Sequence, residues 1–317
     1  MLRVAFMGSP AFAVPCLAAL REHAEIVLVV TQPDQPSGRG RALAPTAVKV
    51  AALEAGLRVE TPPSLRKPEP YARSLAGLDL DLIVVVAYGK ILPADLLAVP
   101  RHGCWNVHAS LLPRHRGAAP VQWSLVEGDR ETGVTLMQMD EGLDTGPILL
   151  QRSIAVDSDD TAGTLLDKLA PLGAEILVEG IAKLVDKTLV ATPQDARQMT
   201  LAPLLEKESG RVDWTLPARG VAGRIRGLDP WPGAFTLLDG ESLKLWGARV
   251  VGGDLAVGST QLAAPGTVLG ASKKGLLVAC GDGAITVGDL QLPGRKRMPT
   301  AALIAGRPIP DGTVLGK

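Results

Sequence analysis

Short, continuously apolar segments alternate with helix-like segments through residues 1–190. A strand without polar alternation is buried on both faces, and such strands separated by helices favour a parallel sheet covered on both sides. We therefore expect an α/β fold with an open, mostly parallel, Rossmann-like sheet. The expected strands are 2–7, 25–31, 81–87 and 103–108, with 132–139 and 148–156 adding an antiparallel element, and the expected helices are 11–21, 47–55, 119–127 and 161–185.

The pattern changes after residue 190. Residues 191–208 have weak periodicity and contain Pro193 and Pro203, which is typical of a linker. From residue 209 to 317, short β-like runs are separated by turns rich in glycine and aspartate, with a helical insert at 217–227. This pattern predicts a small all-β barrel. The expected division is an α/β domain at 1–190, a linker at 191–208 and a barrel domain at 209–317.

Charge and cysteine content exclude several classes of protein. The 33 Lys and Arg balance the 33 Asp and Glu, which argues against a protein that simply coats nucleic acid. Residues 206–317 nevertheless hold 14 basic and 10 acidic side chains, a net charge of +4, either ordinary fluctuation or one end of a polyanion-binding surface. The widely spaced Cys16, Cys104 and Cys280 indicate neither a zinc site nor a disulfide framework. Without a signal peptide or membrane span, we expect a cytoplasmic protein.

The segment Cys104-Trp105-Asn106-Val107-His108 ends an expected strand with two polar side chains. Residues two apart on a strand share a face, so Asn106 and His108 point the same way, at the carboxyl end where open α/β sheets bind ligands. The alternative is that both side chains only satisfy backbone groups of the following loop. A neighbouring histidine and amide at this place favour a catalytic pair.

Asp144 lies in the glycine-containing loop from Asp140 to Pro147. Glycine lets such a loop turn sharply, and a carboxylate brought to a histidine orients the ring and stabilises its protonated form. The alternative is a turn aspartate that bonds to its own backbone. We take Asp144 as the third member of a catalytic trio.

Two basic segments are open to either of two interpretations. Arg39-Gly40-Arg41 lies in a proline- and glycine-rich stretch and either grips phosphates or is a solvated pair of charges. Arg295-Lys296-Arg297 invites the same two interpretations. Gly8-Ser9-Pro10 lacks the later glycines of a dinucleotide-binding motif and is interpreted as a tight turn.

With these motifs assembled, the chain resembles the methionyl-tRNA formyltransferases, a branch of the folate-dependent formyltransferases, nearly from end to end. Ala109 stands where many relatives carry glycine. The segments that carry the resemblance are Val30–Asp34, Gly38–Gly40, Val85–Gly89, Asn106–Pro113, Arg116–Pro120, Glu131–Thr135, Met137–Asp140, Gly142–Gly146, Asp229–Pro232 and Pro265–Val268.

The resemblance implies 10-formyltetrahydrofolate as donor, with no metal, and the α-amine of methionyl initiator tRNA as acceptor. It implies catalytic roles for Asn106, His108 and Asp144, and tRNA contacts by Arg39, Arg41 and a C-terminal barrel that resembles an OB fold. The expected folate-binding residues are Ser110, Leu111, Leu112, Pro113, Tyr88, Gly89, Ile91, Leu92 and Asp140.

Other functions stay open on the sequence alone. A formyltransferase acting on an amino sugar or a purine precursor, and a formyl-folate hydrolase, would share the trio. A noncatalytic RNA-binding protein would not need it. The sequence does not determine the oligomeric state, and a monomer is the working expectation.

Overall fold

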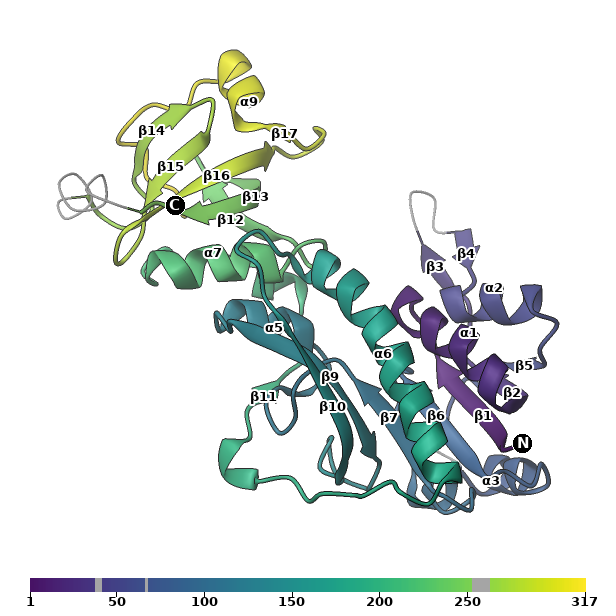
Figure 1. Cartoon of the computed structure of the whole chain (residues 1–317). Helices are drawn as coiled ribbons and strands as arrows, with labels where there is room; N and C mark the ends of the chain where they lie inside the picture. The colour runs from purple at the N-terminus through teal and green to yellow at the C-terminus, as the bar shows by residue number, and fades with distance from the viewer. Residues whose placement is uncertain (38–41, 66–67, 253–262) are drawn as a thin grey trace. The chain divides into compact units, whose positions relative to one another are not determined.

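A computed structural model describes residues 1–37, 42–65, 68–252 and 263–317, and its N-terminal part is built on a seven-stranded sheet (Figure 1). The strand order is β10-β9-β7-β6-β1-β2-β5. The strands from β7 to β5 are parallel to their neighbours, whereas β9 runs antiparallel to β7. The strands are β1 (Arg3–Gly8), β2 (Glu25–Val30), β5 (Val59–Glu60), β6 (Leu82–Val86), β7 (Cys104–His108), β9 (Glu131–Gln138) and β10 (Ile148–Ala155).

Helices cover both faces of this sheet, as the apolar strands predict. All five residues of β6 are buried, and alternate side chains of β1, β2 and β6 pack in one cluster with Leu75 and Leu96. On the other face, a Cβ atom placed on Gly173 or Gly180 would lie within 3.3 Å of side chains of the sheet. The helices are α1 (Val14–His23), preceded by the 3-10 turn η1 (Ala11–Ala13), α2 (Ala47–Glu54), α3 (Pro68–Ala76), α4 (Ala94–Leu97), α5 (Pro120–Val126) and α6 (Ala162–Val185).

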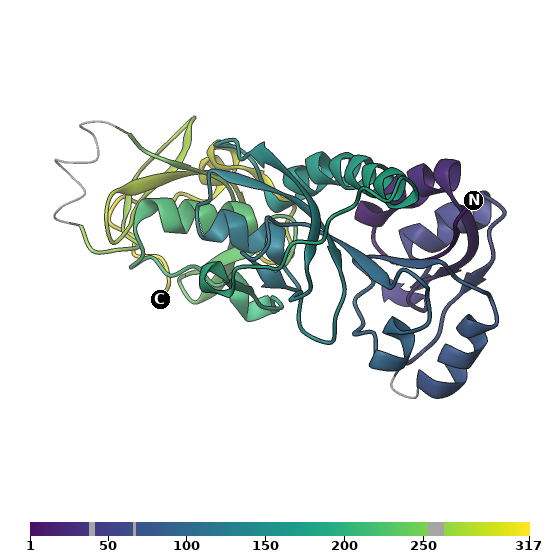
Figure 2. The same ribbon diagram turned by 60° about the horizontal axis from the view of Figure 1, so that its bottom comes forward.

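Glycine in α6 allows the helix to lie close to the sheet, and Figure 2 shows this helix running along it. A Cβ atom on Gly180 would lie 2.4 Å from a Leu136 methyl carbon and 3.3 Å from the Trp105 ring, and one on Gly173 would lie 3.1 Å from Val107. Trp105 and Val107 therefore point toward α6. Because strand side chains alternate, Asn106 and His108 of the same strand point to the other side.

Several small elements were not expected from the sequence. β3 (Gln35–Ser37) and β4 (Ala42–Ala44) pair antiparallel, and the two residues of β5 pair with β2. These strands are too short to show a periodicity. Helix α3 begins with Pro68, and proline is tolerated in the first turn of a helix although it usually indicates a loop.

The C-terminal part of the chain folds around an antiparallel sheet, as its short β runs predict. The order is β12-β13-β16-β15-β14, and β17 pairs with β16. Leu243, Leu276 and Ile285 are fully buried in its core, against which α7 packs. The elements are α7 (Ala218–Gly227), β12 (Ala234–Leu238), β13 (Glu241–Val250), β14 (Val268–Ser272), β15 (Gly275–Ala279), β16 (Ala284–Gln291), β17 (Met298–Pro299) and α9 (Thr300–Gly306).

The chain forms two compact units that interleave in sequence. One consists of Met1–Pro120, Thr132–Ile154 and Leu166–Pro203, and the other of Val121–Glu131, Ala155–Leu165 and Leu204–Lys317. Within the second unit, α7 packs on the backbone of α5. A Cβ atom on Gly223 would lie 2.4 Å from the carbonyl oxygen of Leu125, so the two helices require glycine at this point.

Residues 191–208, the expected linker, contain three short elements: η2 (Ala196–Gln198), β11 (Leu201–Ala202) and η3 (Lys207–Gly210). β11 pairs in parallel with β8 (Arg116–Gly117), and the backbone of Thr192 exchanges two hydrogen bonds of 2.8 Å with Ile148. The first part of this segment is therefore fixed to the N-terminal unit. In the described ranges, no helix is long and apolar enough to cross a membrane.

Candidate active site

Asn106 and His108 lie at the carboxyl end of β7, on the same face of the strand. β7 is an interior strand, with β6 parallel on one side and β9 antiparallel on the other. His108 is only 6% exposed, whereas Asn106 is half-buried. The sheet therefore holds both side chains on a rigid element, at the carboxyl edge where open α/β sheets bind ligands.

Asp144 approaches both residues from the loop that follows β9. Its Oδ1 atom accepts a hydrogen bond of 3.3 Å from the Asn106 amide, and its Oδ2 atom lies 3.7 Å from Nδ1 of His108. The backbone N–H of Gly117 donates a further bond of 2.9 Å to Oδ2. The structure thus brings the three predicted residues together around one carboxylate.

The His108 ring lies between two oxygen atoms. Its Nε2 atom is 3.0 Å from the carbonyl oxygen of His115, and its Nδ1 atom faces the Asp144 carboxylate. A carbonyl oxygen only accepts, so Nε2 carries the hydrogen in this arrangement. An imidazolium would satisfy both neighbours, because each of its nitrogens then donates toward an oxygen.

The segment Ser110–Pro113 forms a loop directly after β7, and side chains of β9 and β10 hold its backbone in place. Thr135 accepts from the Leu112 amide at 3.1 Å and donates to the Ser110 carbonyl at 2.7 Å. Gln151 donates to the Leu112 carbonyl at 2.8 Å. Ser110 and Leu112 are buried, whereas Leu111 and Pro113 are partly exposed, so only the latter two present side chains to a ligand.

The loop after β6 holds the other predicted folate residues in differing environments. Tyr88 is 1% exposed and packs in the core, where burial raises the pKa of its hydroxyl to about 12. Gly89 has a φ of +76°, and a Cβ atom there would lie 2.5 Å from the Gln32 amide, which donates to the Tyr88 carbonyl. Leu92 is buried, and Ile91 is 85% exposed.

Exposed apolar side chains lie on the loop after β6 and on the loop that carries Asp144. Ile91 follows β6, and Leu143, 58% exposed, stands next to Asp144. The predicted folate residue Asp140 is exposed and accepts from the Gly142 amide and the Thr145 hydroxyl at 3.1 and 2.7 Å, which shapes the turn. Exposed apolar side chains with nearby backbone polar groups fit a flat heteroaromatic ring such as a pterin.

Three groups at the site were not found by sequence reasoning. They are the Gly117 amide, the guanidinium of Arg116 and the side-chain amide of Gln194, which donates to the carbonyls of Asp144 and Gly146. Arg116 and Gly117 fell in a recognised segment, but Gln194 lay in the expected linker and no local pattern marked it.

Cysteine does not supply a nucleophile at this site. Burial raises the pKa of Cys16, Cys104 and Cys280 each to about 12, so the three thiols stay protonated near neutral pH. Within the described residues, no group of three or more His, Cys, Asp or Glu side chains is arranged to hold a metal ion. Arg39 and Arg41, the predicted tRNA contacts, lie outside the described residues.

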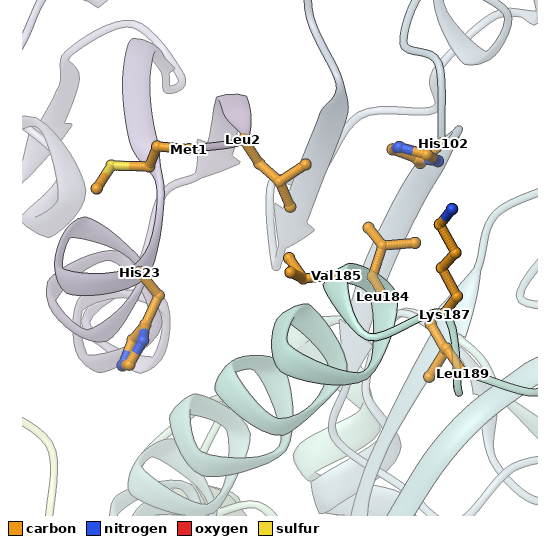
Figure 3. Close-up of a pocket in the computed structure, with 8 residues that line it drawn as sticks. All are labelled: Met1, Leu2, His23, His102, Leu184, Val185, Lys187 and Leu189. Atoms are coloured by element: carbon orange, nitrogen blue, oxygen red, sulfur yellow. The ribbon is translucent and has the colours of Figure 1, made fainter.

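A cavity of about 860 Å³ lies away from the trio (Figure 3). Its lining includes Leu2, which precedes β1, and His102, which precedes β7, together with Lys187 beyond the end of α6. Because Leu2 and His102 precede strands, the cavity lies at the amino ends of the parallel strands, opposite to the edge that carries His108. The size of this cavity is therefore no guide to the position of the active site.

Comparison with known protein families assigns both parts of the chain to formyl transferase domains. Residues 2–181 match the family described as formyl transferase, and residues 204–308 match the formyl transferase C-terminal domain. The chain is 48% identical to the methionyl-tRNA formyltransferase of Geobacter sulfurreducens, over 100% of this chain and 97% of that protein. It is 46% identical to the enzyme of the same name from Caldanaerobacter subterraneus, over 99% and 100%.

A solved structure shares the fold at low identity. It is an N-formyltransferase from Helicobacter canadensis in complex with folinic acid and dTDP-3-aminofucose, with a TM-score of 0.68 at 15% identity. The match covers 90% of this chain and 98% of that one. At this identity the likeness supports the fold alone.

Proposed function

The chain belongs to the methionyl-tRNA formyltransferase family, and we propose that it transfers the formyl group of 10-formyltetrahydrofolate to the α-amine of methionyl initiator tRNA. Relatives named for this activity match over 97–100% of their length at 46–48% identity, whereas the N-formyltransferase from Helicobacter canadensis matches at 15% identity. We further propose that the protein acts in the cytoplasm, where translation begins, and as a monomer. The initiator tRNA would be charged before it reaches this enzyme.

Asn106 and His108 would stabilise the oxygen of the formyl group during transfer. As the amine attacks the formyl carbon, a new N–C bond forms and negative charge develops on that oxygen. The Asn106 amide and a protonated His108 ring are donors fixed on β7, and donors placed in advance are a large part of such catalysis. His108 would have to exchange its present acceptor, the His115 carbonyl at 3.0 Å, for the substrate oxygen.

Asp144 would orient His108 and move the proton. The attacking amine loses a proton, and the departing nitrogen of the donor gains one when the old C–N bond breaks. The Asp144 carboxylate, 3.7 Å from Nδ1 of His108 and partly exposed, is placed to stabilise the imidazolium and to pass this proton directly or through water. Asn106 in turn donates to Asp144 and keeps the carboxylate near the strand end.

The residues around the trio fit a folate. When bound, 10-formyltetrahydrofolate supplies a formyl group on a nitrogen that can depart, so this chain need only bind, orient and move a proton. Ile91 and Leu143 offer exposed apolar surface on the loops after β6 and β9, while the partly exposed Leu111 and Pro113 follow β7. Tyr88, with its side chain in the core, would contribute through its backbone.

The meeting of Asn106, His108 and Asp144 at one strand end is the observation that carries this mechanism. The test is incubation of the purified chain with formyl-labelled donor and either charged initiator tRNA, uncharged initiator tRNA, an aminodeoxysugar nucleotide or no acceptor. We expect label only on methionine recovered from the charged tRNA. Label on the amino sugar would favour the sugar enzyme, and release of formate without acceptor would favour the hydrolase.

A further inference from the structure

The side-chain amide of Gln194 links two segments that are far apart in sequence. Its oxygen accepts from Nε and a terminal nitrogen of Arg116 at 3.1 and 2.7 Å. Its nitrogen donates to the carbonyl oxygens of Asp144 and Gly146 at 2.9 and 2.7 Å. All four hydrogen-bonding positions of the amide are used, so Gln194 joins the guanidinium of Arg116, a residue of β8, to the backbone of the Asp144 loop.

The orientation of this amide is unambiguous. A guanidinium only donates and a carbonyl only accepts, so the oxygen of Gln194 must face Arg116 and its nitrogen must face the loop. Arg116 is 8% exposed, so its donors need a partner inside the protein. A side chain that cannot both accept and donate would break one half of the link.

The backbone held by Gln194 has an unusual conformation. Asp144 has a φ of +52°, in the left-handed region that residues other than glycine seldom adopt. Such a conformation persists when the surroundings determine it more than once. Here Gln194 holds the carbonyl of Asp144, while the Gly117 amide holds its carboxylate at 2.9 Å.

Gln194 is itself fixed from both sides. Two residues earlier, Thr192 and Ile148 exchange backbone bonds of 2.8 Å. Later in the same segment, the Thr200 hydroxyl accepts from the His115 amide at 2.9 Å, and β11 pairs with β8. The segment from 192 to 202 is therefore held by hydrogen bonds on both sides of Gln194, and it is not a flexible linker.

We propose that Gln194 is a positioning residue for catalysis: it holds Asp144 in its left-handed conformation, so that the carboxylate faces His108 and Asn106. Gln194 has no assigned contact with either substrate, and its effect passes through Asp144. The catalytic meaning of this role rests on the proposed function, whereas the mechanical link does not.

Two variants and a matched control separate this role from ordinary stability. Gln194→Ala removes both halves of the link, and Gln194→Glu keeps an acceptor for Arg116 but loses both donors to the loop. We expect each to lower kcat for tRNA formylation about 30-fold, with KM for donor and tRNA changed less than about twofold. Gln198→Ala is the control, because Gln198 is exposed on the same segment and its side-chain amide donates to the Asp195 carboxylate, not to the Asp144 loop; it should match wild type.

A double-mutant cycle tests the path through Asp144. If Gln194 acts by placing this carboxylate, then Gln194→Ala should lower kcat less than about threefold in an Asp144→Asn background. Equal fold-losses in the two backgrounds would overturn the proposal, as would wild-type kcat in both Gln194 variants. If the alanine variant does not fold, the glutamate variant, which retains the Arg116 contact, carries the same cycle.

Amide hydrogen exchange tests the link without any substrate. Because Gly117 donates to the Asp144 carboxylate, freeing the loop should speed exchange of the Gly117 amide at least about tenfold in Gln194→Ala, and not in Gln198→Ala. Unchanged exchange in Gln194→Ala would refute the positioning role even if the protein formylates tRNA. Absence of formylation by the wild-type chain would instead refute the proposed function.

Discussion

Asp144→Asn is the substitution that most directly tests the electrostatic part of the mechanism. The amide has nearly the same shape, and its oxygen can still accept from the Gly117 amide, so the loop should keep its position. What is lost is the negative charge 3.7 Å from Nδ1 of His108, together with the weaker 3.3 Å bond from Asn106, because a donor nitrogen replaces Oδ1. The imidazolium form of His108 then lacks the group that stabilises it.

The size of the effect follows from Coulomb's law. Two unit charges at the observed 3.7 Å attract by about 4 kcal/mol at an effective dielectric constant of about 20. Both side chains are shielded, with exposures of 6% for His108 and 15% for Asp144, so solvent screens the pair only in part. Since about 1.4 kcal/mol corresponds to a tenfold change in rate, kcat should fall by about 10²–10³.

Asp140→Asn is the matched control in the same loop. Asp140 accepts from Gly142 and Thr145 through one oxygen, and an asparagine oxygen can accept the same bonds. Because saturating donor hides any loss of a folate contact by Asp140, single-turnover formylation of charged tRNA under that condition should show Asp140→Asn within about twofold of wild type. If both variants had equal and mild effects on turnover, Asp144 would be only a turn residue and the electrostatic reasoning would fail.

Three further substitutions probe other parts of the molecule. Asn106→Ala removes one donor to the formyl oxygen and should lower kcat by about 10²–10³ with donor binding less affected, and near-normal turnover would reject the role. Arg39→Ala should weaken formylation of charged tRNA at low and high salt while donor binding stays near wild type; unchanged tRNA formylation would remove this residue from the tRNA site. The backbone N–H of Arg3 and the Arg101 side chain lower the pKa of Asp81, so its contribution to stability is present above the unfolded-state pKa and is lost as pH falls through the lower native value. Asp81→Asn should therefore lower the free energy of unfolding by about 1–2 kcal/mol at pH 7, with a smaller difference once the pH falls below the native pKa of Asp81, and a urea-denaturation difference that did not shrink at low pH would contradict this linkage.

The sequence was informative where structure repeats locally. A buried strand is visible as an apolar run, and the period of two placed Asn106 and His108 on one face of β7, as the structure has them. The antiparallel C-terminal sheet followed from its short runs and turns. Helix α3 was not among the expected helices; Pro68 and Pro70 lie in its first turn, where proline is tolerated.

Contacts between distant segments could not be derived in the same way. The bonds of Gln194 to Arg116 and to Asp144 span 78 and 50 residues. No periodicity or turn signal records such a pairing, and the weak pattern of residues 191–208 favoured a linker. Motif reasoning predicted the candidate catalytic residues, whereas the groups that hold them in place could be identified only from the fold.

The interleaving of the two compact units limits how this protein can be recombined. The chain passes between units at 120–121, 131–132, 154–155, 165–166 and 203–204. A chimera that exchanges only the segment after residue 203 would leave α5 with a foreign α7, although Gly223 of α7 is matched to the Leu125 carbonyl of α5. Exchanging the second unit as a whole would require three grafts, so a hybrid with a single crossover inherits a mismatched helix pair.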